Sequence, residues 1–318
     1  MRSKLANYGP LLVVVIALVG GVQAGCSCRG GGGEGTWDGP AWIEATLSGS
    51  SNETAASSVA EAEVEYDTET QSSEMDGGSS PSISAQELRE RLDGNSKPVI
   101  VYVSNTPPNS GSYIEGSVLL SSKSLIQADG SLKSASDLAG VLGNAGITEE
   151  DDLVIYGDCF SCGDFTFVFW VMKYLGHQNV QILEGSPEGW AAAGIAKAST
   201  TTTRPSAIYS PDPCSELLAN YEAIAGGELQ VVDARVPYQF GAGHIDGAIN
   251  IDYNRVIEND WIKGDSALAE IFVNLEKDRP VAVYTKNGGQ ASIVWYALTL
   301  QGYDARIYTW NDWLSHQS

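Results

Sequence analysis

The segment GDCFSCGDFT, residues 157–166, carries two cysteines, Cys159 and Cys162, separated by two residues. A pair with this spacing supports a redox-active dithiol, half of a metal site, or a structural disulfide. A metal site needs a second pair or a histidine cluster, and neither accompanies these cysteines, so no metal is expected. Asp158 and Asp164 flank the pair, and the segment holds no Arg or Lys. Carboxylates disfavour a neighbouring thiolate and repel anions, so we expect low reactivity toward anionic substrates.

A second segment, VAVYTKNGGQAS, residues 281–292, reads as an apolar strand, a glycine-bearing loop and the start of a helix. This layout holds anions on backbone N–H groups. Thr285 stands where such a loop carries its nucleophile, but a hydroxyl with no base beside it is a poor nucleophile. The predicted anion loop comprises Thr285, Lys286, Gly288 and Gly289. Lys286 is the one cation of this loop. We interpret it as a solvated surface lysine, and the alternative is that it contacts a bound anion.

Alternating strands and helices position both segments. Apolar runs predict strands at residues 97–103, 151–157 and 180–185, then at 228–234, 279–285 and 305–310. Helical spacing and caps predict helices at residues 83–92, 137–147, 165–177 and 187–194, then at 213–226, 266–275 and 290–303. The alternation predicts an α/β fold with parallel sheets that have helices on both faces.

The order strand, loop, helix, glycine and strand occurs twice, at residues 154–183 and 281–308. We interpret this as a tandem duplication, with domains at residues 81–197 and 205–318 joined by a threonine-rich linker. Thr285 precedes the helix-ending Gly302 by the same number of residues as Cys159 precedes Gly176. Cys159 therefore takes the equivalent position in the first repeat.

The segment DARVPYQFGAGHIDGAINI, residues 233–251, resembles the signature of rhodanese-like domains. The residues that carry the resemblance are Asp233, Arg235, Phe240, His244 and Gly247. The first repeat keeps only part of this signature, in the segments SYIEGSVLL and LEGSPEGWAAAG. The whole layout resembles the tandem thiosulfate and 3-mercaptopyruvate sulfurtransferases. Asp233, Arg235, His244 and Gly247 are expected to be structural, tying strand to loop.

The resemblance implies a cysteine that takes sulfane sulfur from thiosulfate or a related donor and passes it to a thiophilic acceptor as a persulfide. Usually the C-terminal copy carries this cysteine, where the present sequence has Thr285. The resemblance therefore makes Cys159 the sulfur carrier, with Cys162 assisting and Gly163 in its loop. It implies no cofactor, and it implies a small sulfur-containing anion or a thiol acceptor as partner.

Two other functions remain open from the residues. One is a catalytically inactive binding or scaffold module that keeps the loop of Thr285 as an anion or peptide site. The other is a redox protein that uses Cys159 and Cys162 as a dithiol. A purely structural disulfide between them competes with every catalytic interpretation.

The amino-terminal residues predict export. Arg2 and Lys4 precede the run LLVVVIALVGGV, which is too short for a comfortable membrane span. Residues 1–25 are predicted to be a signal peptide, and Cys26 resembles a lipidation site. A plain cleaved signal and an uncleaved anchor are the alternatives. The protein is thus expected at the outer face of the cell membrane or secreted.

Residues 26–80 are predicted to be a disordered acidic tether, because their hydrophobicity is low and residues 30–80 carry only negative charge. The chain has 40 acidic and 18 basic residues, a formal net charge of −22. This charge excludes nucleic acid as a partner and leaves membrane contact only through an N-terminal lipid or anchor.

Overall fold

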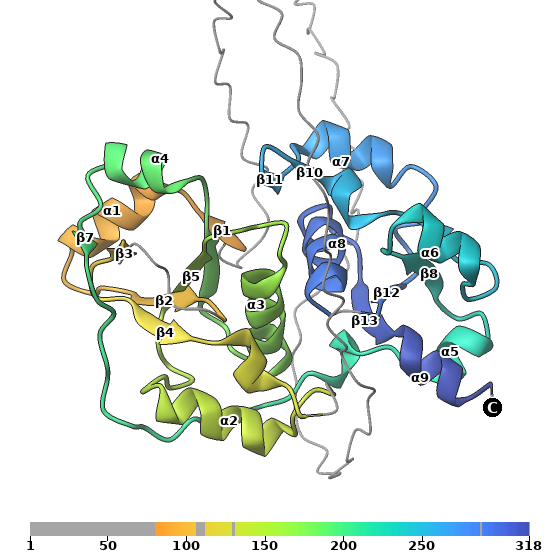
Figure 1. Ribbon diagram of the computed structural model, residues 1–318, viewed down its shortest axis with the longest axis horizontal. Helices are drawn as coiled ribbons and strands as arrows, with labels where there is room; N and C mark the ends of the chain where they lie inside the picture. Colours follow the sequence, from red (N-terminus) through yellow and green to blue (C-terminus); the bar gives the residue numbers. More distant parts are fainter. Residues whose placement is uncertain (1–79, 106–111, 129–130, 287, 318) are drawn as a thin grey trace, which may run out of the picture.

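This computed structural model contains two sheets of parallel strands, one from each half of the chain (Figure 1). The structure describes residues 80–105, 112–128, 131–286 and 288–317. The predicted signal peptide and all but the last residue of the predicted tether, Cys26 included, lie outside the described residues. Among the residues described, no helix is long and apolar enough to cross a membrane.

The first sheet has the strand order β1-β6-β5-β2-β4, and its neighbouring strands are parallel. Its strands are β1 (Ser82–Ile83), β2 (Val99–Val103), β4 (Val118–Leu120), β5 (Leu153–Gly157) and β6 (Val180–Leu183). Its helices are α1 (Ala85–Asp93), α2 (Ala135–Asn144), α3 (Asp164–Tyr174) and α4 (Pro187–Ala192), with a 3₁₀ turn η1 (Ser122–Leu125).

The second sheet has the order β13-β12-β8-β9, again parallel. Its strands are β8 (Gln230–Asp233), β9 (Ile249–Asn250), β12 (Val281–Thr285) and β13 (Ala305–Thr309). Its helices are α5 (Tyr221–Ala225), α6 (Pro237–Ala242), α7 (Asp265–Ile271), α8 (Gly288–Leu300) and α9 (Trp310–Ser315), with 3₁₀ turns η2 (Ser215–Leu217) and η3 (Tyr253–Val256). Two antiparallel pairs stand apart from the sheets: β3 (Tyr113–Ile114) with β7 (Lys197–Ala198), and β10 (Ile257–Glu258) with β11 (Trp261–Ile262).

Both sheets are covered on both faces, as the alternation along β2 illustrates. Ile100 and Tyr102 belong to a buried cluster with side chains of α1 and α4, whereas Val101 and Val103 belong to a cluster with α2 and α3. Successive side chains of a strand point to opposite faces, so one strand supplies both clusters. In the second half, α5 and α9 cover one face, and α7 and α8 cover the other. The predicted α/β fold with two parallel sheets is confirmed.

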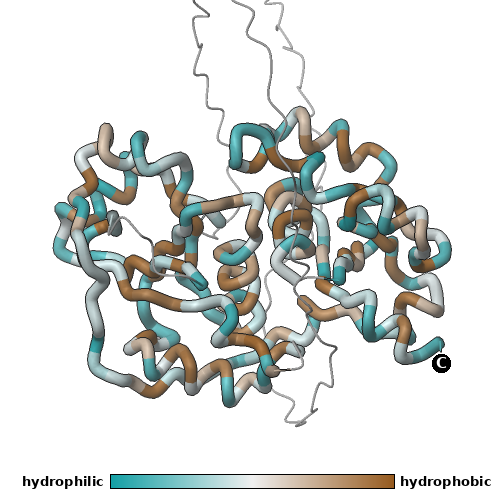
Figure 2. The backbone as a smooth tube through the Cα atoms, in the orientation of Figure 1, coloured by the Kyte–Doolittle hydropathy of each residue, from teal (hydrophilic) through white to brown (hydrophobic). Residues whose placement is uncertain are grey.

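Helices α3 and α8 lie side by side where the two halves meet (Figure 1). One buried apolar cluster runs through both helices and continues into both sheets. Both helices carry apolar residues nearly all round, and Figure 2 shows them largely in the hydrophobic colours. A helix that is apolar on every face must be buried on every face, which requires the other half of the chain.

One predicted helix is divided. The segment 213–226 forms η2 and α5, separated by extended backbone at Leu218. The amide of Ala219 donates to the carbonyl of Ile307 on β13, and the side chain of Asn220 caps α5 through the amide of Ala223. The helical pattern was wrong here, because the segment pairs with the sheet edge before its helix begins. By contrast, Ser84 forms the expected capping box with Glu87.

His177, which follows α3, joins the first half to the segment just after the linker. Its side chain is 2% exposed, its Nε2–H donates to the carbonyl of Asp151 (2.9 Å), and its Nδ1 accepts from the hydroxyl of Tyr209 (3.1 Å). Because one ring nitrogen donates and the other accepts, these contacts fit the neutral form of the His177 imidazole. Burial lowers the pKa of His177 below its usual value.

Acid is therefore expected to destabilise the fold through His177. Since the folded state binds fewer protons than the unfolded state, the free energy of unfolding falls as pH drops from about 6.5 toward the lowered folded pKa. The slope reaches at most about 1.4 kcal/mol per pH unit. Denaturant unfolding between pH 8 and pH 5 measures it, with His177→Gln as the comparison, which should show a shallower loss. Equal slopes for the two proteins would contradict this assignment.

Candidate functional site

The cysteine loop, residues 158–163, joins the carboxyl end of β5 to the start of α3. Cys159 and Cys162 form a disulfide, with their Cα atoms 5.4 Å apart. The backbone N–H of Cys162 points at Cys159 Sγ (3.1 Å), and the hydroxyl of Ser161 lies 3.4 Å from the same sulfur. Cys159 is half-buried and Cys162 is exposed. The loop thus places one sulfur within reach of a backbone amide and leaves the other open to a reductant.

The two carboxylates beside the cysteines bond to neutral donors. Asp158 accepts a short hydrogen bond from the hydroxyl of Tyr102. Burial, and then this hydrogen bond, raises the pKa of Tyr102, which keeps the hydroxyl a donor. Asp164 Oδ1 accepts from Asn105 Nδ2 (2.8 Å) and from the hydroxyl of Ser122 (2.6 Å). Neutral partners leave the negative charge of both carboxylates in place around the loop.

Glycines of the two predicted loops meet at the contact between α3 and α8. Gly163 has a left-handed φ of +79°, and a Cβ built on it would lie 2.3 Å from the carbonyl oxygen of Gly289. One turn further on, the hydroxyls of Thr166 and Ser292 are 2.8 Å apart. Only glycine permits this approach at position 163, so Gly163 serves packing between the repeats, against the backbone of Gly289.

The threonine loop, residues 285–289, is described in part. Thr285 and Gly288 are buried, and Lys286 is exposed. Position 287 lies outside the described residues, so the anion loop predicted here stays a prediction. A buried threonine is consistent with a packing role for this end of β12.

Asp233 and Arg235 form a buried ion pair at the carboxyl end of β8. Their side chains are 0% and 6% exposed, and Arg235 binds both carboxylate oxygens through Nε (2.9 and 3.1 Å). Arg235 also donates to the carbonyl of Gly243 (2.7 Å), and the Tyr284 hydroxyl donates to Asp233 (2.6 Å) while accepting from the amide of Ile245 (3.2 Å). These contacts tie β8, β12 and the following loop together.

His244 and Gly247 stand beside this network and are exposed. The His244 ring stacks on Phe240 with centroids 3.9 Å apart, and its Nδ1–H donates to the Phe240 carbonyl (3.0 Å). Gly247 has a φ of +80° in the turn that follows. The predicted site residues that the structure describes thus lie in three places: around the cysteine loop, in the threonine loop and around β8.

Asp260 is the site residue that sequence analysis missed. Its carboxylate accepts from the amides of Phe160 (3.2 Å) and Ser161 (3.0 Å) in the cysteine loop, one hundred residues away in the chain. Asn259 and Asp260 have φ of 51° and 55° and form the two-residue turn between β10 and β11. An Asn-Asp pair between short apolar stretches is a weak hairpin signal. The Asn-Asp pair gave no indication that the turn contacts the other repeat.

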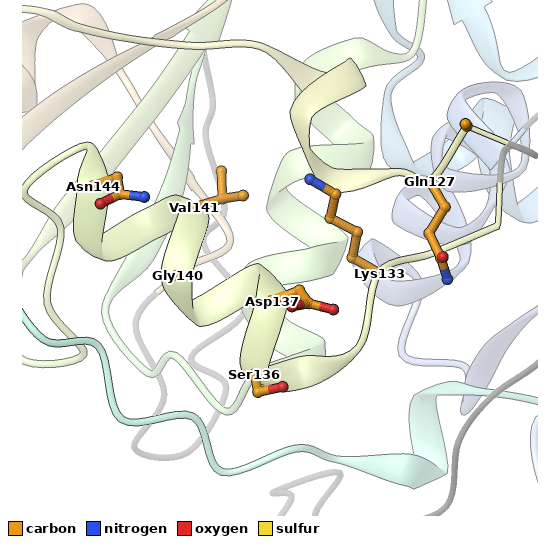
Figure 3. Close-up of a pocket in the computed structure, with 8 residues that line it drawn as sticks. Gln127, Lys133, Ser136, Asp137, Gly140, Val141 and Asn144 are labelled. Atoms are coloured by element: carbon orange, nitrogen blue, oxygen red, sulfur yellow. The ribbon is translucent and has the colours of Figure 1, made fainter.

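A surface pocket of about 520 Å³ lies along α2, and no residue of the cysteine loop lines it (Figure 3). Gln127, Lys133, Ser136, Asp137 and Asn144 contribute its polar groups. A small cavity of about 20 Å³ lies beside Asp158 and is lined by Tyr113, Tyr156 and Trp190 among others. Among the described residues, no group of three His, Cys, Asp or Glu side chains is placed to hold a metal ion.

Comparison with known proteins shows what this chain is similar to. Residues 218–315 match the rhodanese-like domain. A protein of Haloferax volcanii named "Putative thiosulfate sulfurtransferase" is 28% identical over 203 residues, which cover 56% of this chain and 71% of that protein. The alignment with the Haloferax volcanii protein is longer than the segment 218–315 that matches the rhodanese-like domain. Together with the fold, it supports homology to tandem rhodanese-like sulfurtransferases.

Solved structures agree on the fold. The 3-mercaptopyruvate sulfotransferase SseA from Escherichia coli superposes with a TM-score of 0.64 at 21% identity, over 72% of this chain and 97% of SseA. A variant of EanB that carries a cysteine persulfide together with ergothioneine superposes with a TM-score of 0.65 at 16% identity, over 75% of this chain and 69% of EanB. At these identities the likeness shows the rhodanese-like fold alone.

The buried pair at β8 is expected to stabilise the second repeat strongly. Arg235→Met leaves Asp233 charged and buried without its partner, so unfolding should need about 3–5 kcal/mol less free energy. Tyr284→Phe removes one hydrogen bond to a charged group and should cost about 1.5–3 kcal/mol. Denaturant unfolding followed by circular dichroism measures both.

Arg306→Met is the matched control, because Arg306 pairs with the half-exposed Asp304 on the surface. Its loss should cost about 1 kcal/mol or less. If Arg235→Met and Arg306→Met lowered stability equally, the structural role of the buried pair would be rejected.

Proposed function

We propose that this protein is a rhodanese-like sulfurtransferase that carries sulfane sulfur on Cys159 and uses Cys162 as the resolving thiol. The observation that carries the proposal is the backbone N–H of Cys162 aimed at Cys159 Sγ, at the amino end of α3. An amide and a helix amino end both favour negative charge on that sulfur. Homology to proteins named as thiosulfate sulfurtransferases supports the reaction class.

The reaction begins when an external dithiol reduces the disulfide between Cys159 and Cys162. The Cys159 thiolate attacks the outer sulfur of thiosulfate, the sulfur–sulfur bond breaks, and sulfite leaves with the bonding electrons. A thiophilic acceptor such as cyanide then takes the outer sulfur from the persulfide, and the thiolate returns. Without an acceptor, the Cys162 thiolate attacks Cys159 Sγ, hydrosulfide leaves, and the disulfide forms again.

The disulfide also supports a second function, that of a dithiol redox protein. The exposed Cys162 gives a reductant access to the bond, and such exchange needs no sulfur donor. In that case the reduced protein would exchange disulfides with a partner and would gain no sulfur from thiosulfate.

Variants of the two cysteines distinguish sulfur transfer from dithiol redox exchange. Reduced full-length protein is incubated with thiosulfate and cyanide, thiocyanate is measured, and mass spectrometry follows the gain of one sulfur atom. Cys159→Ser should abolish both signals. Cys162→Ser should keep thiocyanate formation. When cyanide is omitted, it should accumulate the persulfide on Cys159 and release no hydrosulfide, because the resolving thiol is absent. No adduct in any variant would reject sulfur transfer, and the reduction potential of the pair would then test the redox function.

We also propose that residues 1–25 direct export and that Cys26 receives a lipid, a proposal that rests on the sequence pattern alone. The full chain expressed in a bacterial host should then partition with membranes, and Cys26→Ala should move it to the soluble fraction. Equal partition of the two proteins would reject lipid anchoring through this residue.

A further inference from the structure

The turn between β10 and β11 places a carboxylate on the backbone of the cysteine loop. Asp260 uses both of its oxygens, one for the amide of Phe160 and the other for that of Ser161. Two successive amides that face one carboxylate form the arrangement that loops of this kind offer to oxyanions. The second repeat therefore supplies an internal anion to a loop of the first repeat.

Packing holds the turn in this position. The ring of Trp261 lies 4.8 Å from that of Phe160, and Phe160 is 2% exposed. Phe160 also contacts Phe165 on α3 and Tyr296 on α8, with centroids 5.4 and 6.4 Å away. The aromatic contacts bury the loop against the second repeat, so the carboxylate does not depend on its two hydrogen bonds alone.

Three carboxylates therefore lie at or beside the cysteine loop. Asp158 and Asp164 flank the cysteines and bond to neutral donors, and Asp260 covers two of the loop amides. Residues 157–166 contain no Arg or Lys. A dianion such as thiosulfate meets repulsion here and finds these amides already bonded.

We propose that Asp260 is the specificity-determining residue of this site, selecting sulfane-sulfur donors of low negative charge against dianionic thiosulfate. This inference rests on the proposed sulfur transfer at Cys159. With an organic thiosulfonate or persulfide, the Cys159 thiolate attacks the terminal sulfur. The sulfur–sulfur bond breaks, and a sulfinate or a thiolate leaves with the electron pair.

The first test compares donors that differ in charge but react alike. Rates of persulfide formation on reduced protein are measured with thiosulfate, a dianion, and with benzenethiosulfonate, a monoanion. Asp260→Gly suits the left-handed backbone and frees both amides, whereas Asp260→Asn keeps the shape and removes the charge. For one charge about 5 Å from a dianion in water-like surroundings, Coulomb's law predicts about a 15-fold gain with thiosulfate. The gain with benzenethiosulfonate should be smaller.

Glu258→Gln is the matched control, because it removes one charge from the same hairpin at an exposed position. It should leave the ratio of the two rates unchanged. If Asp260→Gly and Asp260→Asn also left the ratio unchanged, or if Glu258→Gln raised it equally, the proposal would be overturned. The second result would assign the effect to general surface charge.

A second test does not need sulfur transfer. Inorganic sulfate is titrated into the oxidised protein while the amide resonances of Phe160 and Ser161 are followed by NMR. Asp260→Gly should show saturable shifts at both amides, and the wild-type protein should not. If no donor forms a persulfide, the proposed function fails, and this titration still decides whether Asp260 occupies an anion site. Absent or equal shifts in the two proteins would reject the role of Asp260.

Discussion

The close backbone approach of Gly163 to Gly289 is the constraint on which the arrangement of the site depends. With a carbonyl 2.3 Å from where a Cβ would stand, Gly163 leaves no room for a side chain where the amino ends of α3 and α8 meet. The hydroxyls of Thr166 and Ser292 bond across the same contact. Since each helix begins directly after a loop at the end of a central strand, the packing brings the two halves together next to the cysteine loop.

This packing explains why the cysteine loop is chemically part of both repeats. The loop's own residues supply the disulfide and the amide that faces Cys159, and the second repeat supplies Asp260 and Trp261. Thiol reactivity depends on the charges and amides around the sulfur. A carboxylate from the other repeat is therefore among the charges that act on these thiols.

Much of the fold could be predicted because its signals are local. The capping box of Ser84, the apolar runs that became β2, β5 and β12, and the repeated order of elements each depend on neighbouring residues. The segment 213–226 shows where local signals fail. Its helical spacing is real, but Leu218 pairs with Ile307 on the edge of the second sheet, and a bridge to a distant strand interrupts the helix.

The sequence by itself determined the α/β class, the duplication, and the loop that contains Cys159 and Cys162. These follow from hydrophobic periodicity and from spacing along the chain. Tertiary structure alone decided that Gly163 packs on a backbone carbonyl of the second repeat, and that Asp260 bonds to the amides of Phe160 and Ser161. A hydrogen bond between residues one hundred positions apart leaves no trace in local pattern, because it forms only when the two halves of the chain pack together.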